Sequence, residues 1–290
     1  MSETSEIAVR VAPDRAMAEE WALVLVAEGL SPKVRSARDG FVLGVPAEEA
    51  ERAAAALFAY ERENPAEPQD EEVPVGSAHM WMGFAVATAL VAFFFVVGGR
   101  NPAAQWFMRG SADAERILLG ELWRTVTALT LHADFGHVAA NAIAIALLLS
   151  AVCRALGPGL GFALVLLAGV GGNIVNAVLH GSLHVSVGAS TAVFGAIGVL
   201  GGLAVVRRRR KGARGRHAWM PVAAGLALLA MLGMGEQVDL WAHLWGFVVG
   251  GMLGILVAFA VPGRPAARVQ WALGGSALAV VVYCWALALA

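Results

Sequence analysis

The sequence predicts a polytopic all-α membrane protein with seven transmembrane helices, preceded by a small N-terminal α+β domain. Apolar residues make up 58% of the 290 residues and charged residues only 15%, and the mean hydropathy is +0.67. These values exclude an ordinary soluble globule. The apolar residues also gather in seven long runs, whereas the first 76 residues or so carry short patterns typical of strands and amphipathic helices.

Residues 1–63 have the pattern of a cytosolic α+β domain. IAVRVA and FVLGVP have the composition of short strands, while residues 14–30 and 47–63 have helical periodicity. Residues 64–78 are rich in proline and acid and have no periodicity, which predicts a linker.

Seven apolar runs follow, each near the length of about 20 residues that a bilayer requires. Because the runs are continuously apolar and do not alternate, they predict helices and not barrel strands. The predicted spans are 79–98, 137–153, 158–179, 188–206, 218–235, 240–261 and 269–290.

The distribution of charge predicts how the chain lies in the membrane. Residues 207–216, RRRRKGARGR, hold seven basic residues and no acid, and a loop with such an excess stays in the cytoplasm. Counting spans from this loop places Arg154 on the same side and the acidic residues Glu236 and Asp239 on the other. We therefore expect an integral, multi-pass protein of a bacterial inner or plasma membrane, with a cytoplasmic N-terminus and an outside C-terminus.

The connection between the first two spans, residues 99–136, falls outside. Within it, residues 114–131, AERILLGELWRTVTALTL, are amphipathic at helical spacing. We expect a loop that is partly embedded in the membrane, with an ordinary interfacial helix as the alternative.

Two polar residues inside the spans predict nucleophilic chemistry. Ser190 opens the fourth span and His243 opens the sixth, and both spans run from outside to inside, so both residues lie near the outer surface. A serine hydroxyl attacks an acyl carbon when a base takes its proton, and histidine is a common base. Ser190 is therefore a candidate nucleophile and His243 its candidate base.

Each of these residues also has a structural interpretation. A serine beside glycine at a helix start is commonly an N-cap or a small packing residue, and a single histidine in a span commonly forms an interhelical hydrogen bond. Close approach of the two helices favours the chemical interpretation, because the sixth span carries a stripe of small residues after His243. The glycines on the two helices are Gly195, Gly198 and Gly202 on the fourth span and Gly246 and Gly250 on the sixth.

His137 and Asn141 lie one helical turn apart at the start of the second span, at the same predicted depth. Both can donate hydrogen bonds, as an oxyanion hole requires. A metal-ligand pair and buried structural polarity are the alternatives. Asp239, four residues before His243, either orients that imidazole or simply lies in the outer loop, which we favour.

Motifs on three spans together resemble those of the rhomboid intramembrane proteases. The spacing is H-x4-H-x3-N at the second span, G-x-S at the fourth and A-H-x2-G-x3-G at the sixth. The matching residues are His132, His137, Asn141, Gly188, Ser190, Ala242, His243, Gly246 and Gly250. The resemblance covers residues 79–261, which we assign to a rhomboid-like six-helix protease core, with residues 262–290 as one additional C-terminal helix.

This resemblance implies a Ser190–His243 dyad and an oxyanion hole formed by His137, Asn141 and the Ser190 N–H. It also implies that Phe194 stacks on His243.

In the same way, the resemblance implies that Trp123 and Arg124 brace the first loop and that His132 is structural. Two positions depart from the family pattern. Thr191 follows the nucleophile where glycine is usual, and Phe194 stands where tyrosine is common.

The activity implied is hydrolysis of membrane-anchored protein substrates near the outer membrane face, with the fifth span as a gate. The expected partners are these substrates and the lipid bilayer, with no metal, cofactor or nucleic acid. The alternatives are a catalytically inactive rhomboid-like adaptor that binds transmembrane helices and a small-molecule transporter. Intact Ser190 and His243 argue against the adaptor, and the lack of inverted repeats and midplane charges argues against the transporter.

Overall fold

The structure is a computed structural model of the chain, and it describes residues 6–37, 40–64, 81–101, 103–181, 184–212, 216–232, 239–261 and 263–290. The chain divides into two compact units, Met1–Pro74 and Val75–Ala290. Each unit is described by itself. The predicted linker 64–78 lies outside the described residues, apart from Asn64.

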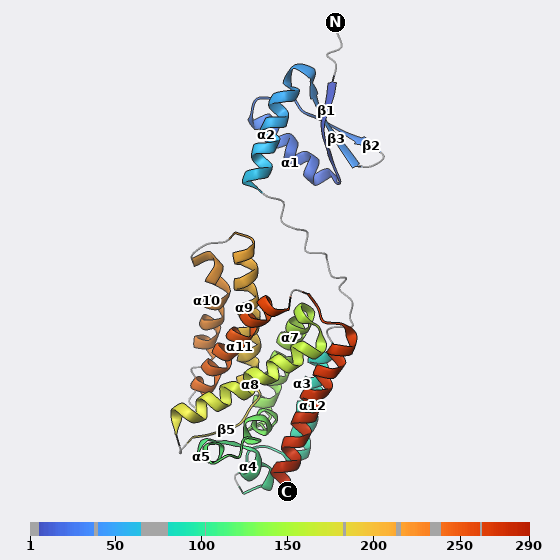
Figure 1. Ribbon diagram of the computed structural model, residues 1–290. Coiled ribbons are helices and arrows are strands. Elements are labelled where there is room, and N and C mark those ends of the chain that lie inside the picture. Colours follow the sequence, from blue (N-terminus) through green and yellow to red (C-terminus); the bar gives the residue numbers. More distant parts are fainter. Residues whose placement is uncertain are drawn as a thin grey trace. The chain divides into compact units, whose positions relative to one another are not determined.

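The N-terminal unit is a three-stranded antiparallel sheet with two helices on one side (Figure 1). Its elements are β1 (Glu6–Ala12), α1 (Arg15–Ala27), β2 (Lys33–Ala37), β3 (Gly40–Pro46), the 3₁₀ turn η1 (Ala47–Glu49) and α2 (Ala50–Glu63). The strand order is β1-β3-β2. Leu25 and Leu57 from the helices and Leu43 and Val45 from β3 form its core.

Strand β2 is an element that the sequence pattern missed. All five of its residues are exposed, and Lys33 and Arg35 on it pair with Glu6 of β1. A polar strand at a sheet edge lacks the apolar alternation on which strand prediction depends.

The second unit is mostly helical. Its long helices are α3 (Trp81–Val97), α7 (Phe135–Leu156), α8 (Pro158–His180), α9 (Ser190–Arg210), α10 (Arg216–Leu232), α11 (Leu240–Ala260) and α12 (Ala267–Leu289). Among the described residues, five of these helices are long and apolar enough to cross a membrane, namely α7, α8, α9, α11 and α12. The arrangement is that of a multi-pass membrane protein. Helices α3 and α10 have 17 described residues each, fewer than the roughly 20 that a bilayer requires, so seven spans is still a proposal.

Helix α9 is the central helix of this unit and lies against α7, α8, α10 and α11. Ala196 and Val199 at its middle are completely buried. The helices α7, α9 and α11 begin at one end of the unit, which we call the Ser190 end, and finish at the other, which we call the arginine end (Figure 1).

The described residues of the connection between α3 and α7 do not form one long interfacial helix, the alternative considered for this segment. They form short pieces, namely α4 (Gln105–Gly110), β4 (Ala112–Asp113), α5 (Ala114–Leu118), α6 (Arg124–Thr127) and the 3₁₀ turn η3 (Ala128–Thr130). Gly120 breaks the pattern, since its φ of +105° lies in the region that favours glycine. The strand β4 pairs antiparallel with β5 (Val185–Ser186), which precedes α9.

Candidate active site

Ser190 is the first residue of α9 and is half-buried. The two residues before it are fixed by the loop between α3 and α7. The Gly188 N–H donates to the Ala128 carbonyl at 2.9 Å, and the Ala189 N–H donates to His132 Nε2 at 3.4 Å. Gly188 has a φ of +132°, a conformation that L side chains rarely adopt. The backbone that presents Ser190 is therefore held from outside its own helix.

His243 lies one turn into α11 and is 6% exposed. Its imidazole stacks on the ring of Phe194, with centroids 4.6 Å apart and an interplanar angle of 27°. Phe194 lies four residues after Ser190 and thus on the same face of α9. The expected stack is present, although phenylalanine replaces the usual tyrosine.

Backbone-to-backbone contact between α9 and α11 brings these two helices together. A Cβ placed on Gly198 or Gly250 would lie within 3.0 Å of backbone atoms of the opposite helix, closer than real Cβ atoms approach. The predicted close approach through glycine is confirmed.

Thr191, the second departure from the family pattern, is buried at the start of this contact. Its methyl group packs against Gly172 of α8 and Gly246 of α11, where Cβ atoms would lie 2.6 Å and 3.1 Å from it. These two glycines supply the space that the larger side chain needs.

Asp239 caps α11, and its carboxylate contacts three groups. Oδ1 accepts from the Ala242 N–H at 3.0 Å, while Oδ2 accepts from Asn176 Nδ2 at 2.9 Å and lies 2.5 Å from His184 Nε2. In the part of the chain that the structure describes, His243 Nδ1 has no hydrogen-bond partner. Asp239 therefore pairs with His184 and does not bond the His243 imidazole.

The His184–Asp239 pair connects the segment before Ser190 with the helix that bears His243. The hydrogen bond with Asp239 raises the pKa of His184 against the effect of burial. Burial alone would raise the pKa of Asp239, but its bonds to His184 and to the Ala242 N–H outweigh burial and lower it. Both groups are thus favoured in their charged forms.

Sequence reasoning missed this cluster, because its members lie 55 and 63 positions apart along the chain. One signal was available. Asn173 and Asn176 are buried polar residues within an apolar span and share one face of α8. Asn173 Nδ2 donates to the Thr125 carbonyl at 2.9 Å, so α8 also holds the first loop.

His137 and Asn141 lie on the first turns of α7. A Cβ placed on Gly188 would lie 2.7 Å from two ring atoms of His137 and 3.5 Å from Ser190 Oγ. The His137 ring and the Ser190 hydroxyl are therefore close to each other. Asn141 is 5% exposed, and its Nδ2 donates to the His137 carbonyl at 3.0 Å. An amide NH₂ has two hydrogens, so one donor of Asn141 is left by this bond.

The metal-ligand alternative for His137 needs further ligands beside it. His132 is its near neighbour, with the two rings edge to face at 5.2 Å. Within the described ranges, no three His, Cys, Asp or Glu side chains come together as metal ligands do.

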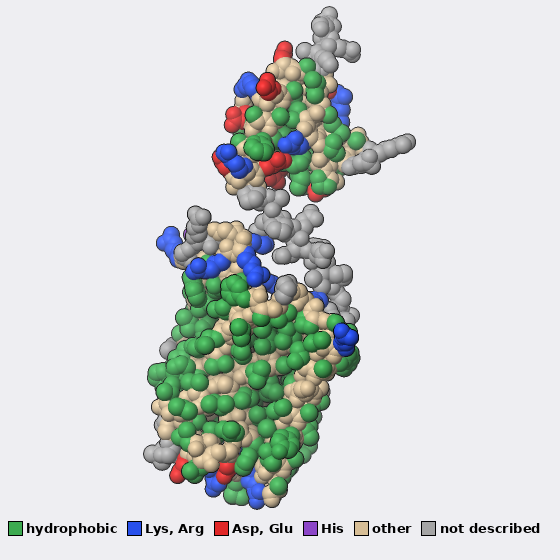
Figure 2. Space-filling model, viewed as in Figure 1, with side chains coloured by type: hydrophobic (Ala, Val, Ile, Leu, Met, Phe, Trp, Pro, Cys, Tyr) green, Lys and Arg blue, Asp and Glu red, His purple; other side chains and the backbone are tan. Residues whose placement is uncertain are grey.

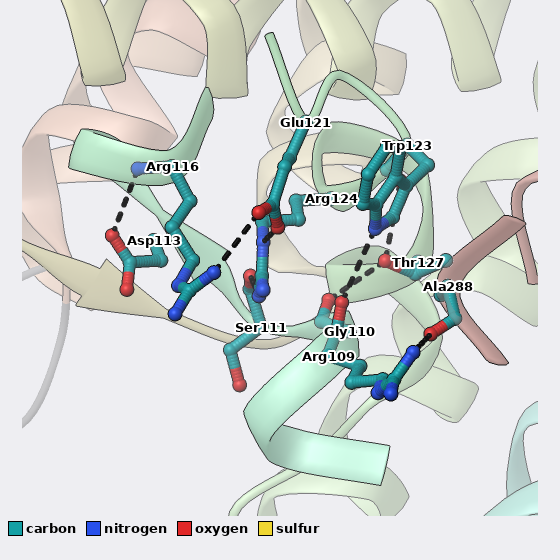
Figure 3. A network of polar contacts seen from close by, with 10 residues as sticks. All are labelled: Arg109, Gly110, Ser111, Asp113, Arg116, Glu121, Trp123, Arg124, Thr127 and Ala288. Atoms are coloured by element: carbon teal, nitrogen blue, oxygen red, sulfur yellow. Dashed lines mark hydrogen bonds and ion pairs between the residues drawn. The ribbon is translucent and has the colours of Figure 1, made fainter. Parts of the chain in front are cut away.

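Trp123 and Arg124 lie in a network that fixes the loop between α3 and α7 (Figure 3). Arg124 is 3% exposed, and it donates to Glu121 Oε2 at 2.6 Å and to the Ser111 carbonyl at 3.1 Å. Trp123 Nε1 donates to the Arg109 carbonyl at 3.3 Å. The bracing implied by the resemblance is present, and it extends to α12, since Arg109 donates to the Ala288 carbonyl.

Comparison with known proteins matches residues 119–259 to the Rhomboid domain family model. The chain is 32% identical over 137 residues to YdcA of Bacillus subtilis, which carries a provisional name as a rhomboid protease, and the match covers 47% of this chain and 68% of YdcA. It is 28% identical over 189 residues to the rhomboid protease GluP of the same organism, covering 63% of this chain and 34% of GluP. It is also 31% identical over 142 residues to rhomboid-like protease 3 of Toxoplasma gondii, covering 49% of this chain and 54% of that protein.

Proposed function

Since the chain belongs to the rhomboid family, we propose that it is an intramembrane serine endopeptidase that cleaves membrane-anchored proteins near the outer membrane face through a Ser190–His243 dyad. The family model and relatives named as rhomboid proteases support a protease. The dyad and the position of the cut are inferred from the residues of this chain.

The stacking of Phe194 on His243 carries this proposal. It sets the imidazole beside the face of α9 that begins at Ser190. The glycine contact between α9 and α11 supports the same inference, because it leaves little room for the two helices to slide apart.

In the proposed reaction, His243 takes the proton of Ser190 Oγ as that oxygen attacks the peptide carbonyl carbon. The tetrahedral intermediate collapses as the C–N bond breaks, and His243 returns the proton to the leaving amine. Water then attacks the acyl-enzyme with the help of the same imidazole and regenerates Ser190.

A dyad is favoured over a triad. The Asp239 carboxylate is engaged by Asn176, His184 and the α11 backbone. The stacked Phe194 ring and the burial of His243 then orient the imidazole in place of a carboxylate.

We further propose that His137, Asn141 and the Ser190 N–H stabilise the oxyanion. The closeness of His137 to the Gly188–Ser190 segment supports this role, and the second hydrogen of the Asn141 amide is available for it. The start of α9 adds a partial positive charge at the same place.

The orientation in the membrane is part of the same proposal. The exposed arginines at the end of α9 favour a cytoplasmic arginine end. The N-terminus would then be cytoplasmic, and the Ser190 end would face outward. We also propose that residues 1–63 form a separate domain without a catalytic role, joined by a linker to a six-helix core and one added helix.

The test is cleavage of a single-span model substrate by the full chain in liposomes. Wild type should cleave it, Ser190→Ala should be inactive, and His243→Ala should retain only traces, because an unassisted serine is a poor nucleophile near neutral pH. Ser276→Ala, the same chemical change on an exposed position of α12, should be fully active. A folded wild type that binds the substrate span without cutting it would favour the inactive adaptor.

The oxyanion assignment predicts a smaller loss for Asn141→Ala. Removing one oxyanion donor costs about 10²- to 10³-fold in kcat, and two donors remain, so we expect the lower end of this range with KM little changed. Steady-state kinetics on the same substrate measure both constants. Full activity of both Asn141→Ala and His137→Ala would return these two residues to a structural role.

A further inference from the structure

Successive arginines at the arginine end are fixed by contacts with neighbouring helices. Arg208 Nη1 donates to the His217 carbonyl of α10 at 3.2 Å. The Arg209 guanidinium lies 5.8 Å from the ring centroid of Trp219, also on α10. Arg210 Nη2 donates to a carbonyl of α11 at 2.8 Å. These guanidinium groups are therefore positioned before any ligand arrives.

The fixed arginines retain most of their hydrogen-bonding capacity. Arg207, Arg208, Arg209 and Arg210 are all exposed, and in the part of the chain that the structure describes none of them pairs with a carboxylate. A guanidinium group has five N–H donors, and the hydrogen bonds to α10 and α11 use one of them in Arg208 and one in Arg210. Figure 2 shows blue side chains gathered at this end of the membrane unit.

An exposed apolar surface begins directly beside these cations. Trp219 is 45% exposed and Met220 is 53% exposed on α10, and Phe259 is 68% exposed on α11. Phe259 also lies under the Arg210 guanidinium, at 5.6 Å. Tryptophan at the end of an apolar helix is typical of headgroup depth. Cation and apolar surface are thus arranged in the order of a phospholipid's headgroup and acyl chain.

We propose that the cluster formed by Arg207–Arg210 and Trp219 binds the headgroup of an anionic phospholipid. The phosphate would accept hydrogen bonds from Arg208 and Arg209, and the acyl chain would lie along α10 beside Trp219. A soluble phosphate could use the same donors but would gain nothing from the apolar surface. Lipid binding here does not depend on whether the chain is a protease.

Quenching of Trp219 fluorescence tests this proposal directly. The full chain is reconstituted in phosphatidylcholine liposomes that contain increasing fractions of acyl-brominated phosphatidylglycerol or acyl-brominated phosphatidylcholine. The signal of Trp219 is the difference between wild type and Trp219→Phe. We expect Trp219 fluorescence to be half-quenched at a clearly lower fraction of brominated phosphatidylglycerol than of brominated phosphatidylcholine. Equal quenching curves for the two lipids would overturn the proposal.

Variants separate a built site from general attraction. Each basic residue near an anionic surface raises the affinity about fivefold. In Arg208→Gln/Arg209→Gln, the preference for phosphatidylglycerol over phosphatidylcholine should therefore fall by at least about fivefold. The control Arg154→Gln/Arg268→Gln removes the same charge from exposed positions on α7 and α12, outside the cluster, and should lower the preference measured at Trp219 by clearly less.

Two further arms can contradict the proposal. A double lysine variant, Arg208→Lys/Arg209→Lys, should lose part of the preference, because lysine keeps the charge but not the planar fork, and full retention would leave only charge attraction. Inorganic phosphate at constant ionic strength should compete poorly. Abolition of the preference by phosphate would mean that the cluster takes a soluble anion.

Discussion

Helix α9 contacts α11 and α10 in two different ways. Against α11 it presents glycine, so that backbone lies on backbone, as at Gly198 and Gly250. Against α10 it presents side chains, and Phe194 packs with Leu229 of that helix. Most described side chains of α10 are exposed, and Pro221 lies inside the helix.

The difference indicates which helix can move. Side chains can change rotamer as neighbouring helices shift, but a glycine contact has no side chain to rearrange. We therefore expect the helices of the proposed nucleophile and base to behave as a rigid pair, and α10 to shift more readily by repacking a few side chains. This contrast supports α10, the predicted fifth span, as the proposed substrate gate.

The largest effect is expected from breaking the glycine contact with one methyl group. Gly250→Ala places a Cβ within 3.0 Å of three Gly195 backbone atoms, so α9 and α11 must separate. Overpacking of this kind costs about 1–3 kcal/mol or more. We expect a strong loss of folded protein and of substrate cleavage, measured by thermal unfolding in detergent and by the liposome assay.

The matched control is the next residue. A Cβ on Gly251 would lie 3.8 Å from the Gly198 carbonyl oxygen, an ordinary contact. Gly251→Ala should therefore behave as wild type. If both variants were equally stable and active, backbone contact would not be what holds the two helices.

A smaller effect is expected at the Ser190 end, where His184 and Asp239 connect the two parts of the site. Asp239→Asn keeps a good helix N-cap but removes the negative charge. Because the His184 side chain is 32% exposed, water screens the ion pair, and we expect the free energy of unfolding to fall only on the order of 1 kcal/mol. The measurement is thermal stability of both forms across pH.

The sign of the pH dependence follows from the two shifts. The pKa of His184 is raised from 6.5. The stability that its charged imidazole contributes is therefore fully present below pH 6.5 and is lost as pH rises through the raised pKa. The pKa of Asp239 is lowered from 3.8, so its contribution is complete above pH 3.8 and is lost as pH falls through the lowered value. The stability of wild type should exceed that of Asp239→Asn most between about pH 4 and 6.5. A stability difference that stays constant up to about pH 9 would contradict the ion pair.

The smallest effect on chemistry is expected from loosening α10. Leu229 is 5% exposed and packs with Phe194 and Phe247. Leu229→Ala should weaken the contact of α10 and change the KM for a membrane-spanning substrate. The rate at which a small soluble serine probe reacts should stay within about twofold, because the rigid pair is untouched. A large drop in probe reactivity would show that α10 helps to hold the site itself.

The sequence could predict the parts of this molecule that depend on local pattern. Continuous apolar runs located the long helices α3 and α7 to α12 within a few residues of their described ends, and the glycine stripe after His243 predicted its contact with α9. The family resemblance added the stack of Phe194 on His243.

Other features depend on contacts between distant residues and could not be predicted in this way. The pairing of His184 with Asp239 leaves no periodic trace in the sequence. The amphipathic pattern of residues 114–131 could not decide between a loop and a single interfacial helix, because Gly120 turns the chain and Arg124 is fixed by the Ser111 carbonyl. Tertiary hydrogen bonds there override local amphipathicity.

The proposed dyad is tested most directly by covalent labelling with a fluorophosphonate probe, followed by mass spectrometry of the digested protein. Wild type should carry the adduct on the peptide containing Ser190, Ser190→Ala should carry none, and His243→Ala should react at least about 100-fold more slowly, because proton removal by a general base typically contributes 10²–10⁴-fold. Labelling that persists undiminished in Ser190→Ala, or that maps to another serine, would contradict the account.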